Sequence, residues 1–252
     1  MKKHTRGFSL IELLVSIVIS MVALVAVIEM YSASQQTSRV QRMQSRLTED
    51  GRFATSMMQR VVYQAGYRQV PSTDPYADSL VDAANQMTVK FDADGSNQIA
   101  CDGSIPGAGT TQTLVIRKIG SKLQCGSTDW IAPTAGTGTG NGNEVVDFGV
   151  KFGIDTGPSN TPEDVGCGTA SAGKKPRDCI VDSYVDTLTT GTHTTDQIMA
   201  VKVCLVLRSE MVDSSVVKPA AVKNCAGTDI TSSQDDHKLY RAFRTTIVLK
   251  NR

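Results

Sequence analysis

The stretch that decides the fold is RGFSLIELLVSIVISMVALVAVIEMYSASQQ, Arg6 to Gln36. From Leu13 to Ile28 it carries no charged residue, and the whole apolar run approaches the roughly 20 residues that a membrane-spanning helix needs. One carboxylate, Glu12, lies near its start, where an acidic side chain is costly and is usually retained for a function. The residues before the run are basic, which predicts that this end stays in the cytoplasm while the rest of the chain is exported.

Two ordinary explanations account for the apolar run but leave Glu12 unexplained. A secretory signal peptide cleaved near Ser32–Ser34 would have an apolar core of only about 7–15 residues. A simple single-pass anchor gives no reason to retain an acid in the membrane. If the chain is instead cut between Gly7 and Phe8, the new amino group lies one helical turn from Glu12. That carboxylate can then offset the positive charge of its own chain or pair with that of a neighbour.

The sequence RGFSLIELLVS, with Gly7, Phe8 and Glu12, resembles the class III signal of type IV pilins and type II secretion pseudopilins. The resemblance implies that a prepilin peptidase cuts after Gly7 and methylates the new terminal residue, Phe8. It also implies that Glu12 guides docking onto the amino terminus of an adjacent subunit. The cut would remove a cytoplasmic leader, residues 1–7, and change the formal charge from +1 to −2, because three basic residues leave with it.

The helix is expected to continue beyond the membrane, with a transmembrane half over 8–30 and an amphipathic half over 31–68. No proline precedes Pro71, and a helix through about Gln64 would be roughly 85 Å long. Gly51 is the expected bend, since glycine is a poor helix former. Met57 and Met58 are interpreted as core residues. Apolar residues recur at helical spacing on one face; they are Val40, Met43, Leu47, Ala54, Met58 and Val61.

Beyond Pro71 the apolar spacing changes to the alternation that is typical of strands. The expected strands cover 87–91, 113–119, 145–154, 198–209 and the end of the chain. Within 145–154 the residues expected on the buried face are Val146, Phe148, Val150, Phe152 and Ile154, and in the last strand Phe243, Thr245, Ile247 and Leu249. The predicted fold class is α+β and type IV pilin-like: one long N-terminal helix packed on an antiparallel β-sheet domain, a periplasmic globular domain spanning 69–252.

Six cysteines follow the apolar segment, and none forms a C-x-x-C pair. This pattern favours disulfides in an oxidising compartment over a zinc ribbon or a redox motif. We predict local pairs in the loops of the β domain: Cys101 with Cys125, Cys167 with Cys179, and Cys204 with Cys225.

Other function classes have little support in the sequence. A net charge of +1 and an aromatic content of 5% do not favour nucleic-acid binding. No nucleophile elbow, H-E-x-x-H motif or phosphate loop occurs, so no enzyme activity, catalytic residue, cofactor or metal is expected. DADGSN, Asp92–Asn97, is interpreted as a hairpin or Asx turn, because its glycine is fourth and not sixth as an EF-hand requires. His193 and His237 are interpreted as solvent-facing loop residues.

Two further stretches are similar to PilW-type minor pilins: TEDGRFATSMMQRVVYQAGYR, Thr48 to Arg68, and the ending YRAFRTTIVLKNR. The resemblance implies a minor pilin that helps to initiate, or prime, type IV pilus assembly in a tip complex. Its implied partners are other minor pilins, the major pilin and prepilin peptidase, with no small-molecule substrate. Its implied place is the bacterial inner membrane, crossed once, with the C-terminal domain in the periplasm, and then the pilus or its tip.

Two alternative functions stay open at this point. One is a type II secretion minor pseudopilin of the J type, which shares the leader, the long helix and a β domain of similar size. The other is a tip adhesin or DNA-uptake minor pilin that uses its exposed loops for recognition.

Overall fold

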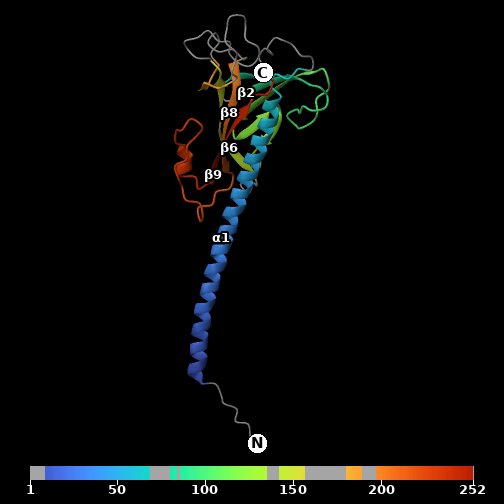
Figure 1. The fold of residues 1–252 in the computed structure, drawn as a ribbon. Helices are drawn as coiled ribbons and strands as arrows, with labels where there is room; N and C mark the ends of the chain where they lie inside the picture. The colour runs from blue at the N-terminus through green and yellow to red at the C-terminus, as the bar shows by residue number, and fades with distance from the viewer. Residues whose placement is uncertain are drawn as a thin grey trace, which may run out of the picture.

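The structure, a computed structural model, describes residues 9–68, 80–83, 86–134, 142–156, 180–188 and 197–251. Its longest element is a single helix, α1 (Leu10–Tyr63), which projects as a stalk from a β-rich head (Figure 1). No residue of α1 before Met43 is buried, whereas the second half buries one face. The buried residues are Met43, Leu47, Gly51, Ala54, Met57, Met58, Val61 and Val62. The part of α1 from Met43 onward is therefore one-sided, with Val40 half-buried at the edge of the buried face.

The head contains two antiparallel sheets. The first is a meander in chain order: β1 (Leu80–Ala83), β2 (Gln86–Asp92), β3 (Thr111–Ile119), β4 (Lys122–Cys125) and β5 (Thr128–Ile131). The second has the order β7-β6-β8-β9, from β6 (Asn143–Ile154), β7 (Ser183–Val185), β8 (Ile198–Ser209) and β9 (Tyr240–Val248). A short 3-10 helix, η2 (Thr231–Gln234), precedes β9. The predicted α+β fold is confirmed, and its strands divide between two sheets.

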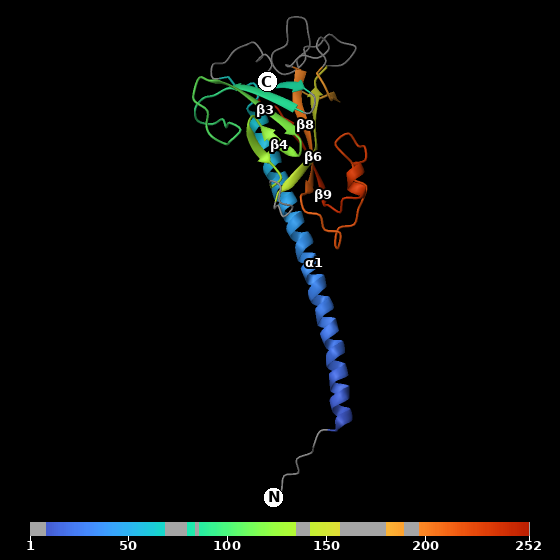
Figure 2. The ribbon, with the colours of Figure 1, turned by 180° about the vertical axis from the view of Figure 1, so that it is seen from behind.

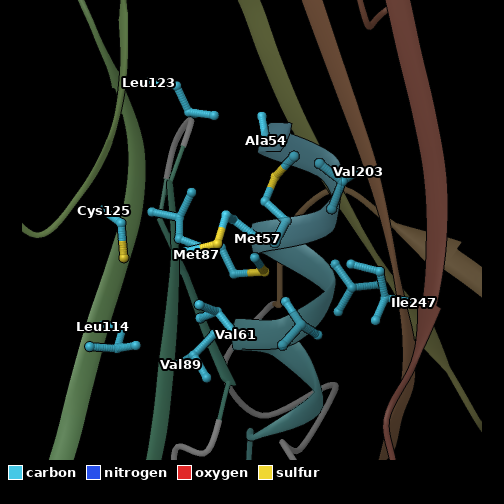
Figure 3. Packing of buried hydrophobic residues seen from close by; sticks show 14 of the residues in the cluster. Ala54, Met57, Val61, Met87, Val89, Leu114, Leu123, Cys125, Val203 and Ile247 are labelled. Atoms are coloured by element: carbon cyan, nitrogen blue, oxygen red, sulfur yellow. The ribbon is translucent and has the colours of Figure 1, made fainter. Parts of the chain in front are cut away.

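The buried end of α1 lies between the two sheets (Figure 3). Met87, Leu114 and Leu123 of the first sheet face the helix from one side, and Val203 and Ile247 of the second sheet face it from the other. These side chains belong to one continuous apolar core. Because burial of apolar surface is the main favourable term in folding, the head depends on the helix that fills its centre.

The register of β6 differs from the strict alternation that its sequence predicts. Its pairing with β8 shifts between Val145 and Asp147. Such a bulge inserts one residue and changes which face the residues before it occupy. Val145 is therefore buried and Val146 only half-buried, while Phe148 and the rest of the strand keep the expected face. The prediction for Val146 was wrong for this reason.

Gly51 lies inside the unbroken helix α1, where it admits a side chain from β9. A Cβ atom at this position would lie 2.1 Å from the ring of Phe243. Two helical turns further on, Gln59 donates a hydrogen bond to Thr245 Oγ1 at 3.2 Å. The glycine that was expected to bend the helix instead allows the last strand to approach it closely.

We expect Gly51→Ala to lower the free energy of unfolding by about 1–3 kcal/mol, the usual cost of overpacking a close contact. This loss should appear in urea denaturation although alanine favours the helix by about 1 kcal/mol. Gln41→Ala, at an exposed position of the same helix, is the matched control for helix propensity. Shortening the ring with Phe243→Leu should restore part of the loss, and a stabilised Gly51→Ala chain would contradict the prediction.

Two disulfides connect described residues: Cys101–Cys125 and Cys204–Cys225. They are the first and third of the predicted pairs, while Cys167 and Cys179 lie outside the described residues. Cys204–Cys225 attaches residues 210–239, here called the C-terminal lobe, to the outer face of β8 (Figure 2). A Cβ atom at Gly149 would lie 2.9 Å from Cys225 Cβ, so a glycine on β6 makes room for this bridge.

Candidate assembly surfaces of the stalk and the head

The Glu12 carboxylate is turned back toward the start of α1. Ser9 caps the helix, and its backbone N–H donates to Glu12 Oε2 at 3.4 Å. A negative charge in this position is stabilised by the positive end of the helix dipole. Gly7 and Phe8 lie outside the described residues, but Ser9 directly follows them. A cut after Gly7 would therefore leave one residue, Phe8, before the cap at which this carboxylate bonds.

The N-terminal half of α1 is apolar and uncovered. Among the residues that the structure describes, α1 is the one helix long and apolar enough to cross a membrane, and none of its most apolar window is buried. Two polar side chains in this half bond back to the helix itself: Ser16 Oγ donates to the Glu12 carbonyl and Ser20 Oγ to the Ser16 carbonyl, both at 2.7 Å. An uncovered apolar surface of this length indicates a membrane or other apolar helices as its surroundings.

The other end of α1 is joined to the first sheet by residues of the Thr48–Arg68 stretch. The Gln64 amide is buried, donates to the Ile99 carbonyl at 3.2 Å and accepts the Ile99 N–H. Gly66, with φ of +75°, donates its N–H to the Lys90 carbonyl at 2.9 Å. Such a φ suits glycine, which has no Cβ penalty there. This part of the motif therefore fixes the stalk in the head.

The last residues of the chain also contact the C-terminal end of α1. Asn251 donates through Nδ2 to the Tyr63 carbonyl at 2.9 Å and to the Ala65 carbonyl at 3.3 Å. These carbonyls belong to the helix end, where α-helices leave acceptors unpaired. Lys250 Nζ lies 4.6 Å from the centroid of the Tyr63 ring. The two stretches that carry the PilW-type resemblance thus meet in space, although almost the whole head separates them in sequence.

Charged groups hold the C-terminal lobe to the sheet and to the stalk. Arg208 on β8 pairs with Glu144 and, at 3.3 Å, with Asp236 of the lobe. Burial and the hydrogen bond to Asp236 raise the pKa of Tyr240. At the base of the head, Asp213 lies 3.9 Å from Arg39 of α1.

The hydrogen bond from Ser215 lowers the pKa of Asp213, and Arg39 contributes to the same shift. Arg39 is exposed and Asp213 half-buried, and an ion pair this close to solvent contributes little stability.

Two loop residues considered as site candidates have structural roles. Asp94 accepts hydrogen bonds from the backbone N–H groups of Ser96 at 2.7 Å and Asn97 at 2.9 Å, and bonds from these residues lower its pKa. This is the Asx turn expected for DADGSN. His237 is half-buried, with Nδ1 2.8 Å from the Val217 carbonyl, so its interpretation as solvent-facing was wrong. His193 lies outside the described residues, and no cluster of three or more potential metal ligands occurs among those described.

Comparison with known proteins gives two family matches. The family described as type IV pilus-assembly protein W matches residues 107–251, and the prokaryotic N-terminal methylation motif matches residues 2–28. No curated protein matches the chain. Among solved structures, a type IV-like pilin from Thermus thermophilus is similar with a TM-score of 0.45 and 13% identity, covering 82% of this chain and 98% of that one.

Proposed function

This chain belongs to the family of type IV pilus-assembly protein W, and we propose that it is a minor pilin that helps to prime pilus assembly within a tip complex of minor pilins. The apolar helix and the methylation motif indicate membrane anchoring and association with the pilus. Pilins are structural proteins, so the role proposed is one of assembly and not of catalysis.

In this proposal a prepilin peptidase removes residues 1–7 by cutting after Gly7, and the new amino group on Phe8 is methylated. Residues 8–30 cross the inner membrane and residues 69–252 lie in the periplasm. The match of the methylation motif to residues 2–28 supports this processing. The basic leader supports the orientation, because positive residues favour the cytoplasmic side.

The observation that carries the proposal is the division of α1 into an uncovered apolar half and a half buried in the head. An uncovered apolar half can leave the bilayer only if other helices replace the lipid around it. Helices in membranes associate through close packing and polar contacts, and Glu12 at the start of α1 supplies one such contact. The head remains outside this bundle and is free to select partners.

Two measurements test this function. Mass spectrometry of the mature chain should show an N-terminus at methylated Phe8, and deleting the gene should abolish or strongly reduce surface piliation. A chain that begins near Ser34 or retains Met1 would overturn the processing. Normal piliation with a loss of protein secretion would instead favour the J-type pseudopilin.

A further inference from the structure

Along the middle of β6, one edge of the strand is not paired with any strand that the structure describes. β8 pairs with β6 along its length, but β7 pairs with its other side only through Phe152–Ile154. At the opposite end, Val145 donates its N–H to the Ser121 carbonyl at 2.8 Å. From Val146 to Lys151, no strand in the described part of the chain pairs with this side. A gap of this size spans roughly 20 Å at about 3.3 Å per residue.

A groove of about 820 Å³ runs along this flank and over the outer face of the sheet. It is lined by residues 147–152 of β6, by Asp186 and Thr187 just after β7, and by residues of β8 and β9. The C-terminal lobe borders it through the disulfide at Cys225. An open strand flank beside a groove is the arrangement to which extended peptides add as an extra strand.

Three cations meet on the outer face in this groove: Lys151, Lys202 and Arg244. Lys151 and Lys202 are direct cross-strand partners, and Lys202 is opposite Thr246, two residues from Arg244. Like charges placed directly opposite each other in a sheet are destabilising. The neighbouring cations on this face therefore repel one another, and an anionic partner would relieve that repulsion.

The described residues compensate these charges only in part. Lys151 lies 2.8 Å from Asp186, and Lys202 Nζ lies 3.5 Å from the centroid of the Tyr184 ring, a favourable cation–π distance. The Arg244 side chain is exposed, and its guanidinium makes no hydrogen bond or ion pair with any residue described.

The other acid that lines the groove, Asp147, already accepts two backbone hydrogen bonds. Its two oxygens accept the N–H groups of Phe148 at 2.9 Å and Cys225 at 2.8 Å. Asp147 therefore helps to hold the lobe on the sheet, and among the residues described it forms no ion pair with Lys202 or Arg244. These two cations are the ones available to a ligand.

We propose that this groove binds an extended, acidic segment of another pilin, which adds a strand to the open flank of β6 and directs its carboxylates toward Lys202 and Arg244. A peptide fits better than a polyanion, because the unpaired backbone groups along this edge of β6 can be matched by another peptide backbone. The inference rests on the proposed pilus function, since it takes the partner from the same assembly.

The test places a photoreactive benzoylphenylalanine at Thr187, an exposed groove residue, in the full chain in piliated cells. Irradiation should give an adduct with another pilin, attached to a segment that contains Asp or Glu, as identified by mass spectrometry. Lys202→Glu/Arg244→Glu should reduce its yield about 10-fold or more, as expected for the loss of roughly 1.4 kcal/mol of binding. Arg117→Glu, which changes an exposed cation on β3, is the matched control and should leave the yield unchanged.

Thermal melting checks that each variant folds. If the Lys202→Glu/Arg244→Glu chain does not fold, the neutral variant Lys202→Gln/Arg244→Gln takes its place. No pilin adduct, an adduct to lipid or nucleic acid, or a yield insensitive to these variants would overturn the groove proposal. If deletion of the gene still abolishes piliation in that case, the proposed function stands and only the groove assignment fails.

Discussion

Replacing Glu12 with glutamine is expected to leave the head folded and the leader cleaved, but to reduce the amount of this chain in sheared surface pili about 100-fold. The amino group created by cleavage would then enter the helix bundle without the carboxylate that offsets it. Breaking a buried charge pair by removing one partner commonly costs about 3–5 kcal/mol, and roughly each 1.4 kcal/mol is a tenfold change in an equilibrium. Quantitative immunoblotting of the sheared fraction against the membrane fraction measures the effect.

Glu29→Gln is the matched control, because it makes the same chemical change at the other end of the apolar segment of α1. It should leave incorporation near the wild-type level. Incorporation of the Glu12→Asp chain should lie between that of the Glu12→Gln chain and that of the wild type, since the shorter side chain keeps the charge but extends less far. Normal incorporation of the Glu12→Gln chain would show that this carboxylate does not guide docking. Mass spectrometry of the N-terminus separates a docking defect from a cleavage defect.

Removing the Cys204–Cys225 disulfide with a double alanine substitution is expected to lower the free energy of unfolding of the oxidised chain by about 3 kcal/mol. The bridge closes a loop between residues 21 apart, and the loss of such a loop constraint in the unfolded chain has about this value. Urea denaturation measures the loss. Hydrogen exchange should rise first in the C-terminal lobe, because the bridge is the cross-link that ties the middle of the lobe to β8.

The Cys101–Cys125 bridge provides an internal comparison. Its residues are 24 apart, so the loop contribution should be nearly the same. Cys125, however, is fully buried in the core, and removing its sulfur also leaves a small cavity there. We therefore expect the Cys101→Ala/Cys125→Ala chain to be the less stable of the two. Equal free energies of unfolding for the two variants would show that the burial of Cys125 adds nothing to stability. Unchanged hydrogen exchange in the C-terminal lobe of the Cys204→Ala/Cys225→Ala chain would contradict the proposed attachment of the lobe by this bridge.

The parts of the fold that the sequence predicts well are those set by local periodicity. The helical spacing from Met43 to Val61 and the long apolar strand at Ile198–Ser209 are both present. The four shortest strands, β1, β4, β5 and β7, were not predicted, because three or four residues carry too little alternation to be recognised. The burial of Val145 in place of Val146 also escaped prediction, since a bulge depends on the strand that pairs with it.

The sequence by itself determined the long helix, its apolar first half, the acid at position 12 and the character of the head, because each depends on residues close together in the chain. Only the tertiary structure decided that Gly51 receives Phe243, that Asn251 closes the helix end, and that Lys151, Lys202 and Arg244 meet beside an open strand. The physical reason is that strand pairing joins residues far apart in sequence, and their register is set by the packing of the whole head around α1.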